Sequence, residues 1–191
     1  MKAQNMNRSS FKTRKLIRKT FAEMLSEKKE ISKISVSELA ERADINRGTF
    51  YSHYDDIYAV AEDYENDLIE RFFDNKTLVS ANDLPKFLES FFEYIKANER
   101  EYMLLCRSDD ILFVAKRLLM LATSKCLELC LNDKRLIDKK HLSTEINVFV
   151  SGLTAEWIKY CRGQSAVSAE ELHDYAVEWS KLFIARRFSS Y

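Results

Sequence analysis

The sequence predicts an all-α protein of about nine helices. Only three Gly and one Pro occur in 191 residues, where roughly 20 would be average, and sandwiches, barrels and Rossmann folds need these residues in their turns. Apolar residues recur instead at the three- and four-residue spacing of helices. Because 46% of the residues are hydrophobic, the chain can bury a sizeable core, and we expect it to be folded.

We expect the first helix over about residues Thr13 to Lys28. Ile17, Phe21 and Met24 fall on one stripe of such a helix, and this pattern is typical of a helix that packs one face on a core. A polar Lys-Lys-Glu segment ends it.

Two short helices with good caps follow. Ser35 and Glu38 form a capping-box pair, which predicts a helix that begins at Val36. Asn46 is an equally good N-cap and predicts a second helix over Arg47 to His53. A three-residue turn separates the two helices, and this arrangement is typical of a helix-turn-helix motif.

A long fourth helix and five further helices complete the prediction. Asp56 caps the fourth helix, which keeps apolar spacing to about Phe72, and the polar stretch from Asp74 to Asp83 then breaks the pattern. We therefore expect a first domain over residues 1–55, a connecting helix over 56–73 and a second helical domain over 74–191. The later helices are expected over Leu84 to Asn98, Arg100 to Cys106, Asp109 to Leu131, Leu142 to Cys161 and Ala169 to Arg187.

The last two helices predict an antiparallel hairpin. Both carry an apolar stripe of the same spacing, formed by Ile146, Val150, Leu153 and Trp157 and by Leu172, Ala176, Trp179 and Phe183. Gly163 is placed to end the first helix, and Ser168 with Glu171 to cap the second. A second apolar set is more than one hairpin can bury, so we expect part of it to meet another subunit. This set comprises Phe149, Gly152, Ala155, Tyr175, Leu182 and Ile184.

Charge is unevenly distributed along the chain although the formal net charge is zero. Residues 1–55 contain twelve Lys and Arg against seven Asp and Glu, and the first 22 residues contain seven basic residues and no acid. Such a segment is typical of a solvated helix face, of an organellar transit peptide or of a surface that meets a polyanion. A polyanion-binding N-terminal module is the most specific of these hypotheses.

The four cysteines predict neither disulfides nor a metal site. Cys106, Cys126, Cys130 and Cys161 form no CxxC pair and lie in apolar helical patterns, where a free Cys behaves as a small hydrophobe. No histidine lies at a ligand spacing from the pair Cys126 and Cys130. The sequence shows no membrane span and no signal-peptide pattern, so the simplest expectation is a cytoplasmic protein without a cofactor.

The helix-turn-helix segment carries a specific pattern. From Ile34 to Tyr54 it is ISVSELAERADINRGTFYSHY. It resembles the TetR/AcrR family of transcriptional regulators, whose pattern is a Ser or Thr cap, an apolar-Ala pair, an Ala-Gly-apolar turn and then Gly-Thr-apolar-Tyr-x-His-aromatic. The positions in register are Ser35, Leu39, Ala40, Ala43, Ile45, Gly48, Thr49, Phe50, Tyr51, His53 and Tyr54. The resemblance is strong over about residues 10–65 and covers the rest only by helix number and the terminal helix pair.

The resemblance and the residue chemistry agree on a recognition helix over residues 47–53 in the DNA major groove. Arg47 has the guanidinium fork that reads guanine, whereas Thr49, Tyr51 and His53 offer donors to phosphate oxygens. Gly48 lets the helix approach the DNA backbone closely. The candidate DNA contacts are Ser35, Ser37, Arg47, Gly48, Thr49, Tyr51, Ser52, His53 and Lys12, while Phe50 and Tyr54 are expected in the core.

One position departs from the family pattern. The family commonly has a Lys at the start of the fourth helix, where it meets a phosphate, but this chain has Ile57 after Asp55 and Asp56. The helix dipole and the basic run from Lys12 to Lys19 are the expected replacements. A substitution of this kind occurs in regulators that resemble the activator of dihydroxyacetone kinase genes, and this likeness weakly favours activation over repression.

The resemblance also implies an effector pocket among the fifth to seventh helices and a four-helix dimer interface built from the last two. The candidate pocket residues are Phe87, Phe91, Tyr94, Tyr102, Met103, Phe113 and Met120, although an aromatic stripe of this kind is as typical of a core. The candidate interface residues are Phe149, Gly152, Ala155, Leu182 and Ile184.

The predicted function is that of a homodimeric TetR-type regulator that binds a palindromic operator in double-stranded DNA and responds to a small-molecule effector. No Gly-rich phosphate loop, Ser/His/Asp set or pair of catalytic carboxylates occurs at an informative spacing, so an enzyme is not expected. The alternative is a helical protein-interaction module that has lost direct DNA binding, which Ile57 and the acidic fourth helix would favour. The intact run Arg47 to Tyr51 favours the regulator.

Overall fold

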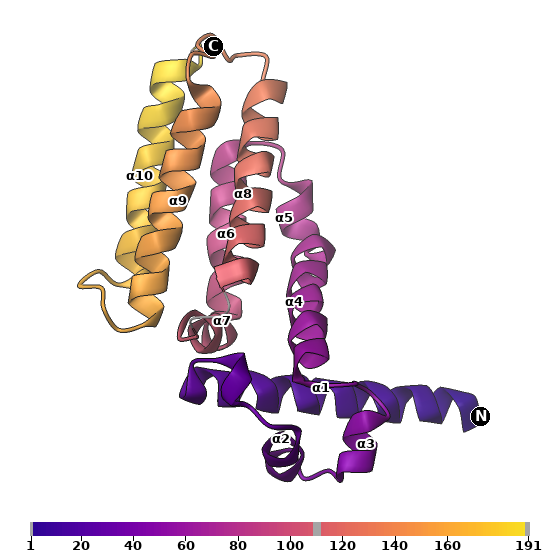
Figure 1. The fold of residues 1–191 in the computed structure, drawn as a ribbon. Helices are drawn as coiled ribbons and strands as arrows, with labels where there is room; N and C mark the ends of the chain where they lie inside the picture. Colours follow the sequence, from indigo (N-terminus) through magenta and orange to yellow (C-terminus); the bar gives the residue numbers. More distant parts are fainter. Residues whose placement is uncertain (1, 109–111, 190–191) are drawn as a thin grey trace. The chain divides into compact units, whose positions relative to one another are not determined.

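The computed structural model describes residues 2–108 and 112–189, and their side chains over 9–108 and 117–189. The regular secondary structure of these residues is helical apart from one isolated bridge between Leu136 and Phe188, so the predicted all-α class is confirmed (Figure 1). The helices are α1 (Lys2–Lys28), α2 (Val36–Arg42), α3 (Arg47–Tyr51), α4 (Ile57–Asp74), α5 (Lys76–Ser80), α6 (Leu84–Ala97), α7 (Glu99–Cys106), α8 (Leu112–Asn132), α9 (Leu142–Cys161) and α10 (Ala169–Arg187), with a 3-10 helix η1 at Ile31–Lys33. None of the described helices is both long and apolar enough to span a membrane.

The chain forms two compact units. Unit 1 comprises Met1–Arg71 with Leu104–Leu112, and unit 2 comprises Phe72–Met103 with Phe113–Tyr191. The backbone therefore passes between the units three times: within α4, within α7 and at the start of α8. In unit 1, the buried Ser108 hydroxyl donates a hydrogen bond to the Lys29 carbonyl oxygen (2.9 Å), which fixes the segment after α7 to the end of α1.

α1 is longer than the sequence pattern indicates. It begins at Lys2 rather than near Thr13, because residues 2–12 contain no Gly or Pro to stop a helix although they lack an apolar stripe. The predicted stripe is confirmed further along, where Ile17, Phe21 and Met24 are fully buried. The core of unit 1 also contains Leu25, Leu39, Phe50, Val60 and Leu68.

The predicted N-caps of the next three helices are confirmed. Each cap side chain accepts a hydrogen bond from a backbone N–H three residues later, at Ser35 Oγ (3.2 Å), Asn46 Oδ1 (2.7 Å) and Asp56 Oδ1 (2.8 Å). Satisfying these otherwise unpaired donors lets helices as short as α2 and α3 form.

The predicted capping box at α2 is only half formed. Ser35 caps the helix, but the Glu38 carboxylate pairs with Lys28 of α1 and with Arg42 instead of the Ser35 N–H. The hydrogen bond from Lys28 holds the pKa of the Glu38 carboxyl below its usual range. A tertiary ion pair has therefore displaced the local contact and joins α2 to α1.

Unit 2 contains a helix that the sequence did not predict. The stretch between Asp74 and Asp83 is polar, but Asn75 Oδ1 accepts a hydrogen bond from the Leu78 N–H (3.1 Å) and Leu78 is buried, so α5 forms. The described residues thus contain ten α-helices instead of the expected nine. The predicted start of the next long helix at Asp109 lies outside the described residues, which show α8 from Leu112.

α9 and α10 form the predicted antiparallel hairpin (Figure 1). The Phe149 and Trp179 rings stack between the two helices with centroids 3.5 Å apart. Gly163 ends α9 with a φ of 68°, and Ser168 with Glu171 forms a complete capping box at 3.2 and 2.7 Å. α10 packs on α6 as well as on α9, which places its stripe inside the unit.

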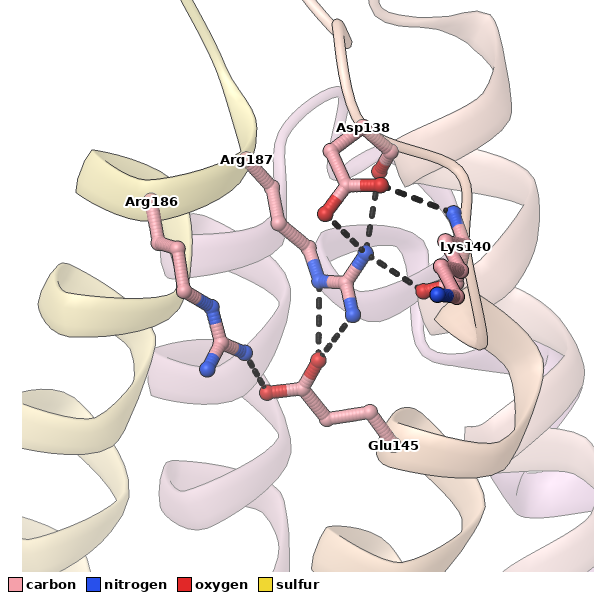
Figure 2. A network of polar contacts seen from close by, with 5 residues as sticks. All are labelled: Asp138, Lys140, Glu145, Arg186 and Arg187. Atoms are coloured by element: carbon pink, nitrogen blue, oxygen red, sulfur yellow. Dashed lines mark hydrogen bonds and ion pairs between the residues drawn. The ribbon is translucent and has the colours of Figure 1, made fainter.

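A buried arginine holds the end of α10. Figure 2 shows the Arg187 guanidinium between Glu145 of α9 and the loop before that helix. Nε donates to Glu145 Oε2 (2.8 Å), and Nη1 donates to the carbonyl oxygens of Asp138 and Lys140 (3.0 Å each). Arg186 also pairs with Glu145. Since a buried guanidinium is costly without partners, this network fixes the end of α10 to the start of α9.

Candidate nucleic-acid interface

α3 presents one exposed face and buries the other. Phe50 is fully buried, and Tyr54 lies against it with ring centroids 6.0 Å apart, so both aromatic residues are in the core as expected. Arg47 at the first helical position is exposed, and Tyr51 is 56% exposed. α3 ends at Tyr51, two residues earlier than predicted, and the half-buried His53 lies in the turn that follows.

The hydroxyl groups of this segment already make hydrogen bonds within the chain. Thr49 Oγ1 donates to Asn46 Oδ1 (3.0 Å), and Ser52 Oγ donates to the Thr49 carbonyl oxygen (2.7 Å). Ser35 Oγ serves as the α2 cap, and Ser37 lies half-buried in the first turn of α2. Among these residues, Thr49 and Ser52 must rotate their hydroxyl groups before they can donate to a phosphate.

Gly48 has a local reason to be glycine. A Cβ at this position would lie 3.2 Å from Asn46 Oδ1, the atom that caps α3. The missing side chain therefore leaves room for the cap, in addition to any close approach to DNA.

The basic run on α1 divides between two faces. Lys12, Lys15 and Lys19 follow the i, i+3, i+7 spacing of a single stripe and are exposed. Arg14 and Arg18 lie on a different stripe: Arg14 is 5.5 Å from the centre of the Tyr54 ring, and Arg18 pairs with Asp63 and Asp67 of α4. The side chains of Lys2 and Arg8 lie outside the described residues. Among the described residues of this run, Arg14 and the three lysines are exposed and make no ion pair, and only Arg14 lies over an aromatic ring.

The position of the family lysine is part of the core. Ile57 is buried at the start of α4, while Asp55 and Asp56 are exposed and Asp56 caps the helix. Tyr58, the next residue, is 61% exposed. A lysine contact from position 57 is therefore absent from this chain, and α4 begins with two carboxylates beside its positive dipole end.

A polar network that the sequence did not reveal lies behind α3. Asp63 Oδ2 accepts hydrogen bonds from the Tyr54 hydroxyl (2.6 Å) and from Arg18 Nη1 (3.1 Å). Burial, followed by the hydrogen bond to Asp63, raises the pKa of the Tyr54 hydroxyl well above its usual range. The sequence indicates only that the fourth helix is acidic, so the partners of Asp63 become evident only from the tertiary contacts.

The candidate pocket residues of unit 2 fall into a packed group and an exposed one. Phe87, Tyr94 and Tyr102 are buried, Phe91 and Met103 are half-buried, and the Tyr102 hydroxyl donates to that of Tyr94 (3.3 Å). Phe72 packs edge-on against Phe91 and Tyr94. Met120 differs from this group because it is 66% exposed. The Phe113 side chain lies outside the described residues.

The candidate interface residues on the α9–α10 hairpin differ from one another in how far they are buried. Phe149 is buried by its stack on Trp179, and Ile184 is half-buried. Gly152, Ala155 and Leu182 are exposed, Leu182 by 67%. Val148 and Tyr175, by 66% and 60%, are exposed on the same two helices. The exposed part of the predicted set is therefore Gly152, Ala155, Tyr175 and Leu182, to which Val148 is added.

The cysteines behave as core residues. Cys126, Cys130 and Cys161 are buried, Cys106 is half-buried, and none of the four forms a disulfide. Burial raises the pKa of the Cys126 thiol to about 12 and that of Cys130 to about 11. Such thiols stay protonated at neutral pH and are poor ligands and nucleophiles. Within the described part of the chain, no three His, Cys, Asp or Glu residues are grouped to hold a metal ion.

Comparison with known proteins identifies the fold. No model of a known protein family matches the sequence. A crystal structure of a TetR-like transcriptional regulator from Rhodococcus sp. RHA1 superposes with a TM-score of 0.58 at 14% identity, covering 90% of this chain and 96% of that one. The fold is therefore that of a TetR-like regulator.

A curated sequence shows a local similarity. An uncharacterized HTH-type transcriptional regulator of Bacillus subtilis strain 168, YxbF, is 34% identical over 53 residues, which are 28% of this chain. The match spans only 14% of the length of that protein.

Proposed function

We propose that the chain is a homodimeric, DNA-binding transcriptional regulator rather than an enzyme. The observation that carries this proposal is the geometry of α3, a capped helix that is anchored by the buried Phe50 and presents Arg47 and Tyr51 to solvent. A TetR-like fold and a local similarity to an HTH-type regulator support it.

In this proposal the exposed side of α3 enters the major groove of DNA. Arg47, at the N-terminal end of the helix, reads a guanine edge through its guanidinium fork. Tyr51 and His53 donate to phosphates, with Ser35 and Ser37 as further contacts and with Thr49 and Ser52 joining them after hydroxyl rotation. The exposed stripe of Lys12, Lys15 and Lys19 supplies the positive charge that Ile57 does not.

The exposed residues of the hairpin fit the proposed dimer. Gly152, Ala155, Val148, Tyr175 and Leu182 form an apolar set on α9 and α10 that the single chain leaves in water. A two-fold pairing of two hairpins would bury this set in a four-helix bundle and would match a palindromic operator. The aromatic group around Phe87 and Tyr94 in unit 2 is the proposed region for a small-molecule effector.

Selection from a pool of random DNA duplexes tests the proposal. The full-length protein is incubated with duplexes of about 30 base pairs, roughly three helical turns, and the bound molecules are sequenced over successive rounds. We expect enrichment of a palindromic sequence, a dimer in light scattering, and a Kd for that duplex at least about 1000-fold below the Kd for an unrelated one. A pool that stays random would contradict the proposal and favour the protein-interaction alternative.

A further inference from the structure

Asp63 connects three segments of unit 1 through one carboxylate. It lies on α4, and its Oδ2 accepts hydrogen bonds from Tyr54, just after α3, and from Arg18 of α1. The Tyr54 hydroxyl is 2.6 Å and Arg18 Nη1 is 3.1 Å from this oxygen. Both donors are largely shielded from water, with the Tyr54 residue 5% and the Arg18 side chain 13% exposed.

Each donor is itself tied to an element that the proposed function places on DNA. The Tyr54 N–H donates to the Phe50 carbonyl oxygen (3.0 Å), and Phe50 is the buried anchor of α3. Arg18 lies on the same helix as the exposed stripe of Lys12, Lys15 and Lys19. The position of α3 relative to the lysine stripe is thus linked through the Asp63 carboxylate.

Neighbouring contacts hold the carboxylate in place. Arg18 Nη2 pairs with Asp67 one turn along α4 (2.9 Å), and Asp67 pairs with Arg71 (2.9 Å). The Arg14 guanidinium lies over the Tyr54 ring, which adds a second link between α1 and the end of the motif. In a partly dehydrated site these charge-assisted hydrogen bonds are directional, so they define an orientation as well as an attraction.

We propose that Asp63 is a positioning residue for DNA binding: it orients α3 against α1 so that the recognition helix and the lysine stripe engage one duplex together. This inference rests on the proposed function. Asp63 contacts no DNA in this arrangement and acts through Tyr54 and Arg18.

The sign of the expected effect separates positioning from simple electrostatics. Removing a carboxylate from a DNA-binding unit reduces repulsion from phosphates and by itself tightens binding. Loss of positioning weakens binding, because α3 and the lysines no longer fit the same duplex. Glu62→Gln is the matched control, since Glu62 precedes Asp63 on α4, is exposed, and loses the same charge.

The experiment measures Kd and its salt dependence for the duplex enriched by the wild-type protein. We expect Asp63→Asn to weaken binding about tenfold and to lower the slope of log affinity against log salt by about 0.9 for each lysine that no longer reaches a phosphate. Glu62→Gln is expected to bind within about twofold of wild type or tighter, with an unchanged slope. The concentration of binding-competent protein is first determined by titration at saturating DNA, and Kd is calculated from that concentration. A variant that is merely less stable therefore keeps its Kd and slope.

Two further variants keep the test decisive if Asp63→Asn folds poorly. Tyr54→Phe removes only the hydroxyl and retains the ring, and we expect about threefold weaker binding with a smaller slope. In an Arg18→Gln background, Asp63→Asn is expected to add little, because the two act through one contact.

Wild-type Kd and slope in both Asp63→Asn and Tyr54→Phe would overturn the proposal while leaving the DNA-binding function standing. Failure of the wild-type protein to enrich any duplex would instead remove the proposed function.

Discussion

The helix caps of unit 1 and the Arg187 network of unit 2 differ in how far along the chain their partners lie. In unit 1, the caps of α2, α3 and α4 each reach only three residues, from Ser35, Asn46 and Asp56. In unit 2, the partners of Arg187 lie 42 to 49 residues away. Contacts between residues close in the chain can be recognised as sequence motifs, whereas contacts between distant residues cannot.

The largest expected effect would show that DNA binding by unit 1 depends on dimerisation through unit 2. An added Cβ at Gly152 meets nothing within 4 Å in the chain, so Gly152→Glu is expected to leave the fold intact. In the proposed dimer it would bury unpartnered carboxylates at a cost of several kcal/mol. We expect a folded monomer in light scattering and loss of affinity for the enriched duplex, with Gly152→Ala as the dimeric control. A Gly152→Glu dimer with normal affinity would show that the interface lies elsewhere.

A second substitution tests the distant contacts of unit 2. Glu145→Ala removes the main anionic partner of the buried Arg187, and we expect the free energy of unfolding to fall by about 3 kcal/mol, with Asp138 still 3.4 Å away as a partial substitute. Glu156→Ala on the same helix breaks only the exposed pair with Lys159 and should change stability by less than about 0.5 kcal/mol. Chemical denaturation measures both. Equal effects would mean that the Arg187 network contributes no more than a surface pair.

A third substitution addresses the exposed side of α3. Arg47→Ala should weaken binding to the enriched duplex by about 1 to 3 kcal/mol and relax preference at one base position. Tyr51→Phe should weaken binding to all sequences alike, because it removes a phosphate donor. Repeating the selection with each variant distinguishes the two. An unchanged site preference for Arg47→Ala would refute base reading by this residue.

The turn between α2 and α3 offers a smaller test of local signals. Asp44 has a φ of 50°, the left-handed region that favours glycine, where the family pattern has Gly. Asp44→Gly should raise the free energy of unfolding by up to about 1 kcal/mol, and Asp44→Ala should lower it. Thermal unfolding under matched conditions gives the comparison. A stabilised alanine variant would contradict the strain argument.

The smallest expected effect concerns the lysine stripe. Lys12→Gln with Lys15→Gln should flatten the dependence of log affinity on log salt by up to about 0.9 for each phosphate that is no longer neutralised. Lys139→Gln with Lys140→Gln, two exposed lysines of unit 2, provides a control with the same charge change. Equal slopes for the two double variants would mean that the stripe is only solvated.

Sequence reasoning succeeded where the determinant was local. It located the caps, the hairpin, and the burial of Phe50 and Tyr54. It missed the first part of α1, whose sequence has no apolar period, and α5, which lies in a polar stretch that outweighed the cap at Asn75. The charged networks could not be predicted for a different reason. Asp63 and Arg18 are 45 residues apart in the sequence, and only the packing of α1 on α4 brings them together.

The three passages of the backbone between the units constrain how this fold can exchange segments with a related one. A recombination that joins residues 1–71 to a foreign C-terminal region would discard Leu105 and the buried Ser108, which donates to the Lys29 carbonyl in unit 1. Unit 1 therefore cannot be transferred intact through a single junction in the chain, because it contains two separate segments. Chimeras should keep residues 104–108 with their own α1, and over evolutionary time this short segment is expected to co-vary with residues 1–71 even though it lies beyond residue 100.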